Sequence, residues 1–464
     1  MNHFTGLTLL KSISMHKVIL ALVFFIWCFN GYSQKWQKLF DGKTLQGWTI
    51  KAGTATYQVE NGVIVGTTVV NSPNTFLVTN KTYKNFVAEV DFLLDDTSIN
   101  SGIQFRSNIG NDANPRVFGY QYEMDPSSRA WSGGIYDEQR RGWLYPLSMH
   151  PAAQKAYVHG RFNTARIECF NNMVRTYLNG TLTAQLIDTI VEPGFIALQV
   201  HSIGKPGEAG KKIRWKNIRI MEIDKMPEFG APSDAPVVNL IPNTISDWEK
   251  KHGWRLLFDG KTNAGWKGAY KSGFPDKGWK IQNGLLSVEA SKGAESTNGG
   301  DIVTLEQFQT FDLSFEFRLT PGANSGVKYF VTLKENNPGS AIGLEYQLLD
   351  DKLHADANMG RDGNRKLASL YDLIPAYKQE RFYSQPGGWN RGRIIVYPDN
   401  KVEHYLNGVK VLEYVRGSAD FRRLVSLSKY KVWEGFGEAP KGHILLQDHG
   451  NHVDFRSIKI RELK

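Results

Sequence analysis

The chain contains the same sequence pattern twice, and this duplication limits what it can fold into. Residues 36–48 read Trp-Gln-Lys-Leu-Phe-Asp-Gly-Lys-Thr-Leu-Gln-Gly-Trp, and residues 254–266 read Trp-Arg-Leu-Leu-Phe-Asp-Gly-Lys-Thr-Asn-Ala-Gly-Trp. Asn-Ser-Gly and Leu-Asn-Gly motifs then recur in the same order. A repeat of about 220 residues is far longer than a solenoid unit, so each copy is expected to be a complete domain with its own core.

The N-terminal residues 1–33 have the features of a signal peptide. Lys11, His16 and Lys17 precede an apolar run over 18–29, which is shorter than the roughly 20 residues of a membrane-spanning helix. Cys28 lacks the small preceding residue of a lipidated cysteine, so a lipoprotein is not expected. We therefore expect a periplasmic or secreted protein that does not span the membrane.

The repeat predicts a first domain over 34–225 and a second over 251–464. Between them, residues 226–250 contain several prolines and are expected to form a linker. At its end, Ser246-Asp247-Trp248-Glu249 predicts a capping box that opens a short helix.

The periodicity of the chain favours an all-β fold. Residues 86–92 and 311–319 alternate between apolar and polar side chains, as strands with one buried face do. Leu-Asn-Gly predicts a hairpin turn after Leu178 and after Leu406. Forty-five glycines and many aromatic residues suit a β-sandwich with short strands.

Charge and motifs exclude several classes of function. The formal net charge is +10, but the basic residues are scattered rather than gathered on one face, so no nucleic-acid partner is expected. The sequence has no Gly-x-Ser-x-Gly, His-Glu-x-x-His, Walker or dinucleotide motif. Serine-hydrolase, zinc-protease and nucleotide chemistry are therefore not expected, and no metal ligands are assigned.

The first candidate cluster lies on one predicted strand of each copy. Alternation places Gln121, Glu123 and Asp125 on one strand face in the first copy, and Glu345 and Gln347 on one face in the second. This polar face lines a groove, or it belongs to a half-solvated edge strand.

The second cluster surrounds a repeated Tyr-Asp pair. Aromatic rings stack on sugars and arginines bind oxygen-rich ligands, although Arg–Asp pairs that only hold a folded loop are an equal alternative. The cluster comprises Tyr136, Asp137, Trp131, Arg140 and Arg141 in the first copy, and Tyr371 and Asp372 in the second.

The third cluster is a Gln-x-His pattern in both copies. Gln199 and His201 occur in the first copy, and Gln447 and His449 occupy the matching place in the second. A lone histidine is usually a satisfied polar group, but recurrence of the pair favours a functional site. His404 is matched by Thr176, so any role for it is confined to the second copy.

Together these motifs resemble the 3-keto-disaccharide hydrolase family of secreted bacterial proteins. The similarity rests on Leu-Phe-Asp-Gly-Lys-Thr, Asn-Ser-Gly, Glu-Tyr-Gln-Leu-Leu-Asp, Leu-Tyr-Asp-Leu, Trp-Asn-Arg, His-Tyr-Leu-Asn-Gly and Leu-Gln-Asp-His-Gly. It covers the whole second copy closely. The first copy is more distant, because it exchanges Glu and Gln in the groove strand.

The resemblance implies two tandem concanavalin A-like jelly-roll sandwiches. It also implies cleavage of glycosides whose sugar a separate oxidoreductase has oxidised at C3. For that reaction we hypothesise a base at His449 or His201, and an orienting or acidic carboxyl among Glu345, Asp372, Glu123 and Asp137. Sugar oxygens would be held by the remaining polar and aromatic candidates: Gln347, Gln447, Tyr371, His404, Gln121, Gln199, Arg140, Arg141, Trp131 and Tyr136.

No cofactor is required by the sequence, although a divalent cation would also suit enolate chemistry. The competing hypothesis is a carbohydrate-binding, lectin-like protein without activity, because the same sandwich serves both purposes.

Overall fold

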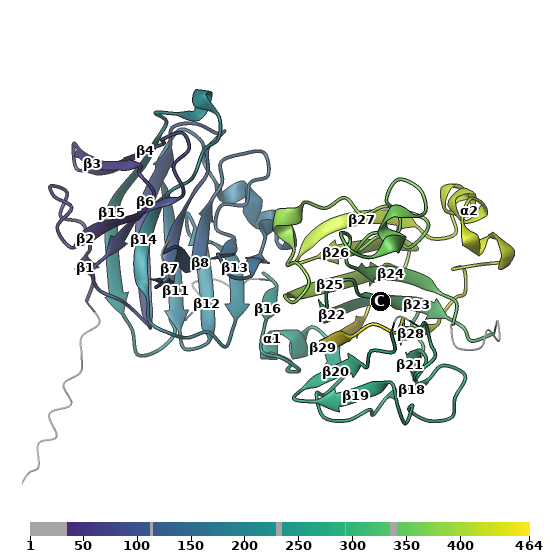
Figure 1. Ribbon diagram of the computed structural model, residues 1–464. Helices are drawn as coiled ribbons and strands as arrows, with labels where there is room; N and C mark the ends of the chain where they lie inside the picture. The colour runs from purple at the N-terminus through teal and green to yellow at the C-terminus, as the bar shows by residue number, and fades with distance from the viewer. Residues whose placement is uncertain (1–34, 112–114, 229–233, 293, 335–340) are drawn as a thin grey trace, which may run out of the picture. The chain divides into compact units, whose positions relative to one another are not determined.

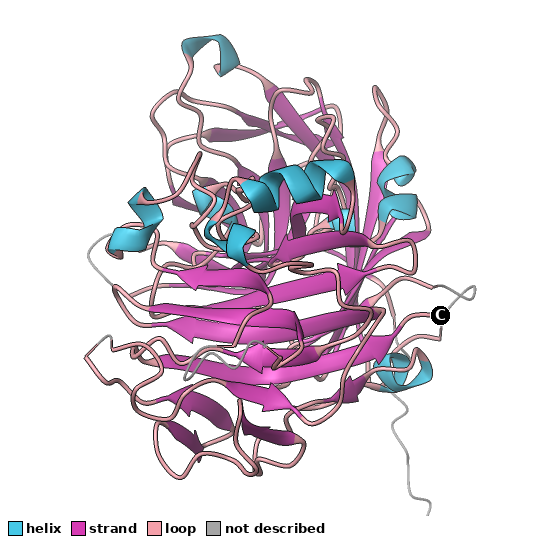
Figure 2. Cartoon of the chain, turned by 90° about the vertical axis from the view of Figure 1, so that its right-hand side faces the viewer, coloured by secondary structure: helices cyan, strands magenta, loops and turns pink. Residues whose placement is uncertain are grey.

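The computed structural model describes residues 35–111, 115–228, 234–292, 294–334 and 341–464. The predicted signal peptide lies outside these residues. Strands make up most of the regular secondary structure, and the helices are short (Figure 2). Each repeat forms a sandwich of two antiparallel-rich sheets, which confirms the all-β, jelly-roll prediction.

The first sandwich has one larger and one smaller sheet. In spatial order, the larger sheet contains β16 (Val237–Asn239), β13 (Thr181–Ile187), β12 (Met173–Leu178), β11 (Asn163–Phe170), β6 (Phe86–Leu94), β15 (Lys212–Glu222), β4 (Val63–Thr67) and β3 (Thr56–Glu60), with β1 (Gln37–Lys38) on β15. The smaller contains β10 (Gly142–Tyr145), β9 (Ile135–Glu138), β8 (Val117–Met124), β7 (Ser101–Ile109), β14 (Phe195–Val200), β5 (Thr75–Thr79) and β2 (Trp48–Ala52).

The second sandwich repeats this arrangement. Its larger sheet contains β19 (Trp279–Gln282), β20 (Leu285–Val288), β29 (Val453–Glu462), β22 (Phe311–Leu319), β25 (Trp389–Val396), β26 (Lys401–Leu406) and β27 (Val409–Val415), with β17 (Arg255–Leu256) on β29. Its smaller sheet contains β18 (Trp266–Gly268), β21 (Ile302–Thr304), β28 (His443–Leu446), β23 (Asn324–Val331) and β24 (Leu344–Leu349) (Figure 1).

Short helices connect the strands. The α-helices are α1 (Asp247–Lys251) and α2 (Ala419–Ser426), and the 3-10 turns are η1 (Leu147–Met149), η2 (Pro151–Ala156), η3 (Pro206–Glu208), η4 (Ala355–Asn358), η5 (Glu380–Phe382) and η6 (Lys429–Val432). Within the described ranges, no helix has both the length and the apolar character needed to cross a membrane.

The alternating strands build the cores, as their periodicity predicts. Phe86, Ala88, Val90 and Phe92 of β6 pack in the first core, and the alternate residues of β22 pack in the second. Burying every second side chain of a strand gives one face to the core and leaves the other face for polar groups.

The segment between the repeats is partly structured. The capping box is present, since Ser246 Oγ accepts from Glu249 N and the Glu249 carboxylate accepts from Ser246 N. β16 pairs in parallel with β13, so part of the expected linker extends the sheet of the first sandwich.

The motif that recurs most closely in the two copies, Leu-Phe-Asp-Gly-Lys-Thr, has a structural role. Asp41 accepts from the backbone of Lys43 and Thr44, and Asp259 accepts from Lys261 and Thr262 in the same way. The tryptophan that ends each motif donates its indole N–H to the carbonyl of Leu39 or Leu257, at 2.6 Å in both copies. These contacts explain why the motif recurs almost unchanged.

Candidate active site

The serine of each Asn-Ser-Gly motif binds the backbone of the glutamine that belongs to the candidate site. Ser101 Oγ donates to Gln199 O at 2.6 Å, and Ser325 Oγ donates to Gln447 O at 2.8 Å. The glycine that follows leaves room for a polar side chain of the neighbouring strand. A Cβ on Gly326 would lie 2.2 Å from Glu345 Oε1.

Five of the predicted second-copy residues meet in one cavity of about 260 Å³. They project from β24, from a turn in the long connection between β24 and β25, and from the segment that follows β28. Its lining comprises the predicted Glu345, Gln347, Tyr371, Gln447 and His449, together with Glu295, Asn324, Lys328, Ala341, Ile342, Gly343, Lys429, Tyr430 and Trp433.

Glu345 is the buried acid of this cavity. Burial raises the pKa of its carboxyl to about 7, and the ammonium groups of Lys328 and Lys429 counteract that effect only in part. In the amide orientation that directs its nitrogen towards acceptors, Gln347 donates to Glu345 Oε1 at 3.2 Å. Glu345 and Gln347 therefore share one strand face, as the alternation predicts.

Two lysines complete the cavity, and the sequence comparison of the copies missed both. Lys328 of β23 is 4% exposed, donates to Ala341 O at 3.1 Å and lies 3.7 Å from Asp301 Oδ2. Burial acts to lower its pKa, but Asp301, Glu345 and Glu295 outweigh it and raise that pKa, so the ammonium stays charged. Lys429 Nζ lies 4.4 Å from the ring centre of Tyr371.

Gln447 and His449 lie just beyond the strand on which they were expected, because β28 ends at Leu446. His449 Nε2 is 3.9 Å from Glu295 Oε2, and Gln447 Nε2 donates to Glu295 Oε1 at 3.4 Å. Among the described residues, Gln447 Oε1 is buried without a hydrogen-bond partner. A ligand hydroxyl in the cavity could donate to this oxygen.

His404 and Asp372 do not line this cavity, contrary to the sequence-based prediction. His404 is fully buried, where Tyr329 Oη lies 2.9 Å from its Nε2 and Ala368 O lies 3.2 Å from its Nδ1. Burial lowers its pKa to about 3, so it is a neutral core residue. Asp372 accepts from Arg365 Nε at 2.7 Å and from Lys429 N at 2.8 Å, and thereby positions the lysine segment.

In the first copy the matching strand face is closed by an arginine. Glu123 Oε1 accepts from Arg129 Nη2 at 3.0 Å and from Asn100 Nδ2 at 3.2 Å, and its Oε2 accepts from Gln121 Nε2 at 3.0 Å. Burial raises the pKa of Glu123 to about 7, partly counteracted by Arg129. Both carboxylate oxygens already have donors.

A cavity of about 430 Å³ opens beside this face. Two residues singled out from sequence line it, His201 and Asp125 of the candidate strand face, whereas Gln121, Glu123 and Gln199 are not among the lining residues. The lining comprises Thr68, Thr97, Ser98, Ile99, Asn100, Asp125, Ser127, Arg129, His201, Ser202, Ile203, Glu208 and Arg381.

The Tyr-Asp cluster of the first copy is structural, which favours the second of its two interpretations. The fully buried Asp137 accepts from Arg140 Nε at 2.7 Å and from Arg141 Nε at 2.5 Å, while Arg141 also reaches Asp188. These pairs compensate the buried charges. The rings of Trp131 and Tyr136 pack edge-on against Trp143, with ring centres 4.7 and 5.3 Å apart, and neither residue lines the cavity beside this strand face.

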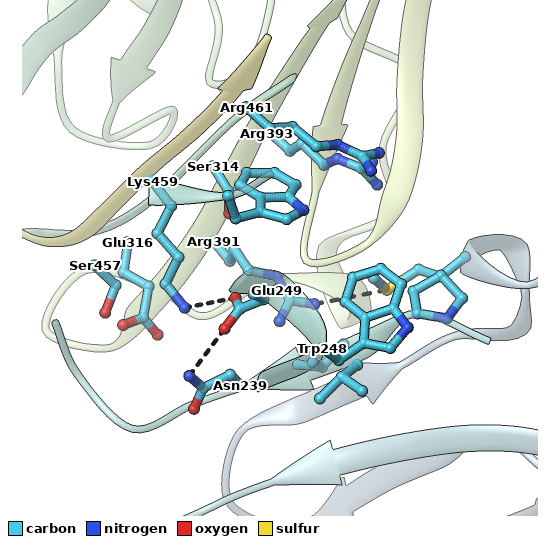
Figure 3. A pocket seen from close by; sticks show the side chains of 15 residues that line it. Asn239, Trp248, Glu249, Ser314, Glu316, Arg391, Arg393, Ser457, Lys459 and Arg461 are labelled. Carbon is cyan, nitrogen blue, oxygen red and sulfur yellow. Dashed lines mark hydrogen bonds and ion pairs between the residues drawn. The ribbon is translucent and has the colours of Figure 1, made fainter. Parts of the chain in front are cut away.

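A third cavity is too small for a sugar. Its volume is about 90 Å³, far below the roughly 300–1,000 Å³ of typical ligand pockets. Figure 3 shows Lys459 and Asn239 pointing at Glu249, with Lys459 Nζ at 2.8 Å and Asn239 Nδ2 at 3.1 Å. Within the described part of the chain, no cluster of three or more His, Cys, Asp or Glu side chains could hold a metal ion.

The model of the 3-keto-alpha-glucoside-1,2-lyase-like domain matches residues 35–221 and again 253–461. The chain belongs to this family. Both copies are thus members, which confirms the resemblance found in the sequence.

The chain is also similar to one curated protein and to two solved structures. A curated 3-keto-disaccharide hydrolase of Bacteroides thetaiotaomicron is 37% identical over 233 residues, which cover 46% of this chain and 79% of that protein. Two crystal structures of proposed glycosyl hydrolases from Parabacteroides distasonis are 28% and 26% identical. They cover 48% and 45% of this chain and 100% and 99% of their own, with TM-scores of 0.42 and 0.35.

Proposed function

We propose that this chain cleaves 3-keto-glycosides, either 3-keto-disaccharides or 3-keto-glucosides, in the cavity of the second sandwich. Family membership and the curated relative identify a glycoside-cleaving enzyme. The observation that supports the location is the meeting of Glu345, His449 and two lysines in one cavity. An upstream enzyme that oxidises the sugar at C3 would have to supply the substrate.

The chemistry begins at C2, because a ketone at C3 acidifies the C2–H bond. A base takes the C2 proton, and the electron pair of that bond is delocalised onto the C3 oxygen. The C1–O bond then breaks as a C1=C2 bond forms, and the leaving oxygen takes a proton from an acid. Addition of water across C1=C2 turns this elimination into net hydrolysis.

His449 is the base in this proposal. Imidazole needs little adjustment to accept a proton near neutral pH. The carboxylate of Glu295, 3.9 Å from Nε2, stabilises the imidazolium formed when His449 takes the proton. His449 is partly accessible, with 24% of its side chain exposed, so a bound sugar can reach it.

Glu345 is the acid. A carboxyl with a pKa of about 7 still holds its proton in a large fraction of molecules at neutral pH. Its side chain is buried and lines the cavity, where it can pass that proton to the leaving oxygen of a bound sugar. Gln347 beside it fixes the carboxyl orientation through Oε1.

Lys328 and Lys429 stabilise the enolate oxygen. A fixed ammonium in a site of low dielectric is worth more than the same charge in water. Both lysines line the cavity with Glu345, and the charge of Lys328 is maintained by Asp301. Tyr371 and Trp433 supply aromatic surface for the sugar face.

The decisive experiment varies the leaving group. Wild-type protein is incubated with a 3-keto-disaccharide, with p-nitrophenyl 3-keto-α-glucoside and with both unoxidised parents. We expect cleavage of the keto substrates alone. Glu345→Gln is expected to lose about 10²-fold or more in kcat with the sugar leaving group but little with p-nitrophenolate, which leaves without a proton.

Control variants distinguish the role of the base from that of the acid, and the contribution of one copy from that of the other. His449→Ala is expected to inactivate the enzyme towards both keto substrates, whereas His201→Ala in the same assay tests the first copy. Product analysis distinguishes the unsaturated ketose of elimination from the hydrolysis product, and a chelator in the assay tests for a divalent cation. No cleavage of either keto substrate would refute the proposal.

A further inference from the structure

The two copies differ in which groove carboxyl a ligand can reach. Glu345 lines its cavity, whereas Glu123 accepts from Arg129, Asn100 and Gln121 and lies outside the lining of the cavity beside it. A carboxylate that already accepts from two side-chain amides and a guanidinium, and that lies outside the cavity lining, is less accessible to a substrate than Glu345.

Arg129 causes this difference, and the second copy has no counterpart to it. Arg129 Nε bonds Asp125 Oδ2 at 2.6 Å while its Nη2 bonds Glu123, and its guanidinium lies 4.5 Å from the ring centre of Trp131. The register that pairs Ser101 with Met124 and Ser325 with Leu348 places the exposed Leu353 where the first copy has Arg129. A leucine cannot donate to a carboxylate, so this position supplies a guanidinium to the groove in the first copy only.

The first cavity nevertheless has the features of a binding site. At about 430 Å³ it falls within the range of ligand pockets. His201 Nδ1 is 2.7 Å from Ser202 O, and donating there leaves Nε2 as an acceptor. Ser98 and Asn100 add a hydroxyl and an amide to the wall, and Arg381 of η5, from the second copy, adds a guanidinium.

The charges of the cavity wall favour a neutral ligand. Arg129 and Arg381 contribute two positive charges, and Asp125 and Glu208 contribute two negative charges. A carboxylate or sulfate ligand would meet as much repulsion as attraction. A ring bearing several hydroxyls can instead use the donors and acceptors on all sides.

We propose that the first sandwich is a non-catalytic site for a neutral hexopyranose, with Arg129 as the residue that separates it from the catalytic copy. The choice of a sugar as ligand rests on the proposed function. Binding here would keep a glycan near the second cavity and raise its local concentration there.

The test measures binding in the full chain without turnover. In a Glu345→Gln/His449→Ala background, saturation-transfer NMR and calorimetry with methyl α-D-glucopyranoside are expected to report binding. Adding His201→Ala is expected to weaken it about tenfold or more. Ser202→Trp fills the cavity from an exposed position and is expected to abolish binding, with thermal melting to verify the fold.

Each alternative result overturns the proposal. Absence of binding in the double-variant background, or binding that survives Ser202→Trp, places no sugar site in the first copy. Glucuronate binding about tenfold tighter than the neutral glucoside would contradict the charge argument. If Glu123→Gln lost activity while Glu345→Gln kept it, the first copy would be the catalytic one. Binding is measured without cleavage, so this test gives an answer even if the proposed function is wrong.

Discussion

Lys328 and Glu345 are direct register partners across β23 and β24, and both side chains line the cavity of the second sandwich. The matching register pair of the first copy is Gln104 and Gln121, which share a hydrogen bond of 2.6 Å. A pair of ionisable side chains in one copy thus replaces a neutral amide pair in the other. This exchange is the clearest structural reason to place catalysis in the second copy.

Replacing Lys328 should remove the enolate stabiliser. Lys328→Gln is expected to lower kcat by about 10²- to 10³-fold, the usual loss when one oxyanion donor is removed, with a smaller change in KM. Steady-state cleavage of a 3-keto-glucoside measures both constants. An unchanged kcat would exclude Lys328 from the mechanism.

The first copy supplies a control for the fold of that variant. Lys328→Gln/Glu345→Gln recreates the Gln–Gln pair that the first sandwich already accommodates. We expect this double variant to be folded, with a cooperative melt, but inactive. Loss of the fold would show that the pair is needed for stability.

Gly326 is required to leave room for Glu345. A Cβ at this position would lie 2.2 Å from Glu345 Oε1, and one at Gly102 would lie 2.3 Å from Gln121 Cδ. Alanine at either site should cost about 1–3 kcal/mol of stability through overpacking. Only Gly326→Ala is expected to reduce cleavage, about tenfold or more, because it displaces the acid.

The melting temperatures and cleavage rates of these two glycine variants are compared directly. Similar destabilisation with activity lost only in the second copy supports the division between copies. Equal loss of activity in Gly102→Ala would argue that the first copy takes part in the reaction.

Sequence alone predicted the layout of the fold because the signals are local. Alternation of apolar and polar residues predicted β6 and β22. The Leu-Asn-Gly motifs predicted the turns at Asn179 and Asn407, where both asparagines adopt a positive φ near 50°. The same alternation correctly placed Glu345 and Gln347 on one strand face. Each of these features depends on residues next to one another in the chain.

The site was predicted incompletely because it depends on distant contacts and on differences between copies. Lys328 was missed since its partner in the first copy is the neutral Gln104, and Lys429 lies in a segment without a clear counterpart. His404 was predicted to hold a sugar oxygen but is enclosed by Tyr329 and Ala368. Recurrence identifies scaffold more reliably than it identifies catalytic groups.

Burial of Glu345 should also appear in the pH dependence of stability. Its folded pKa of about 7 exceeds the ordinary value of 4.5, so the folded state holds its proton where the unfolded state has lost it. The stability from this group is therefore complete below pH 4.5 and lost as pH rises through about 7, with a magnitude on the order of 3 kcal/mol.

Urea unfolding of the wild type and of Glu345→Gln isolates this contribution, because glutamine imitates the protonated carboxyl at every pH. The variant is expected to gain stability relative to the wild type between pH 5 and pH 8. A difference that stays constant over this interval would contradict the raised pKa. Glu123→Gln is not an equivalent control, since it disturbs the ion pair with Arg129.

Asp372 is expected to act as a positioning residue for Lys429. Its carboxylate accepts from Arg365 Nε and from Lys429 N, and its backbone adopts φ of 61°, a conformation that asparagine adopts more readily than alanine. Asp372→Ala should therefore release the segment and lower kcat about tenfold, whereas Asp372→Asn should keep most of the activity. If both variants retained wild-type kcat and KM, Lys429 would not need this anchor. If both lost activity equally, the carboxylate charge rather than its positioning would matter, and the pH profile of kcat would then shift as well.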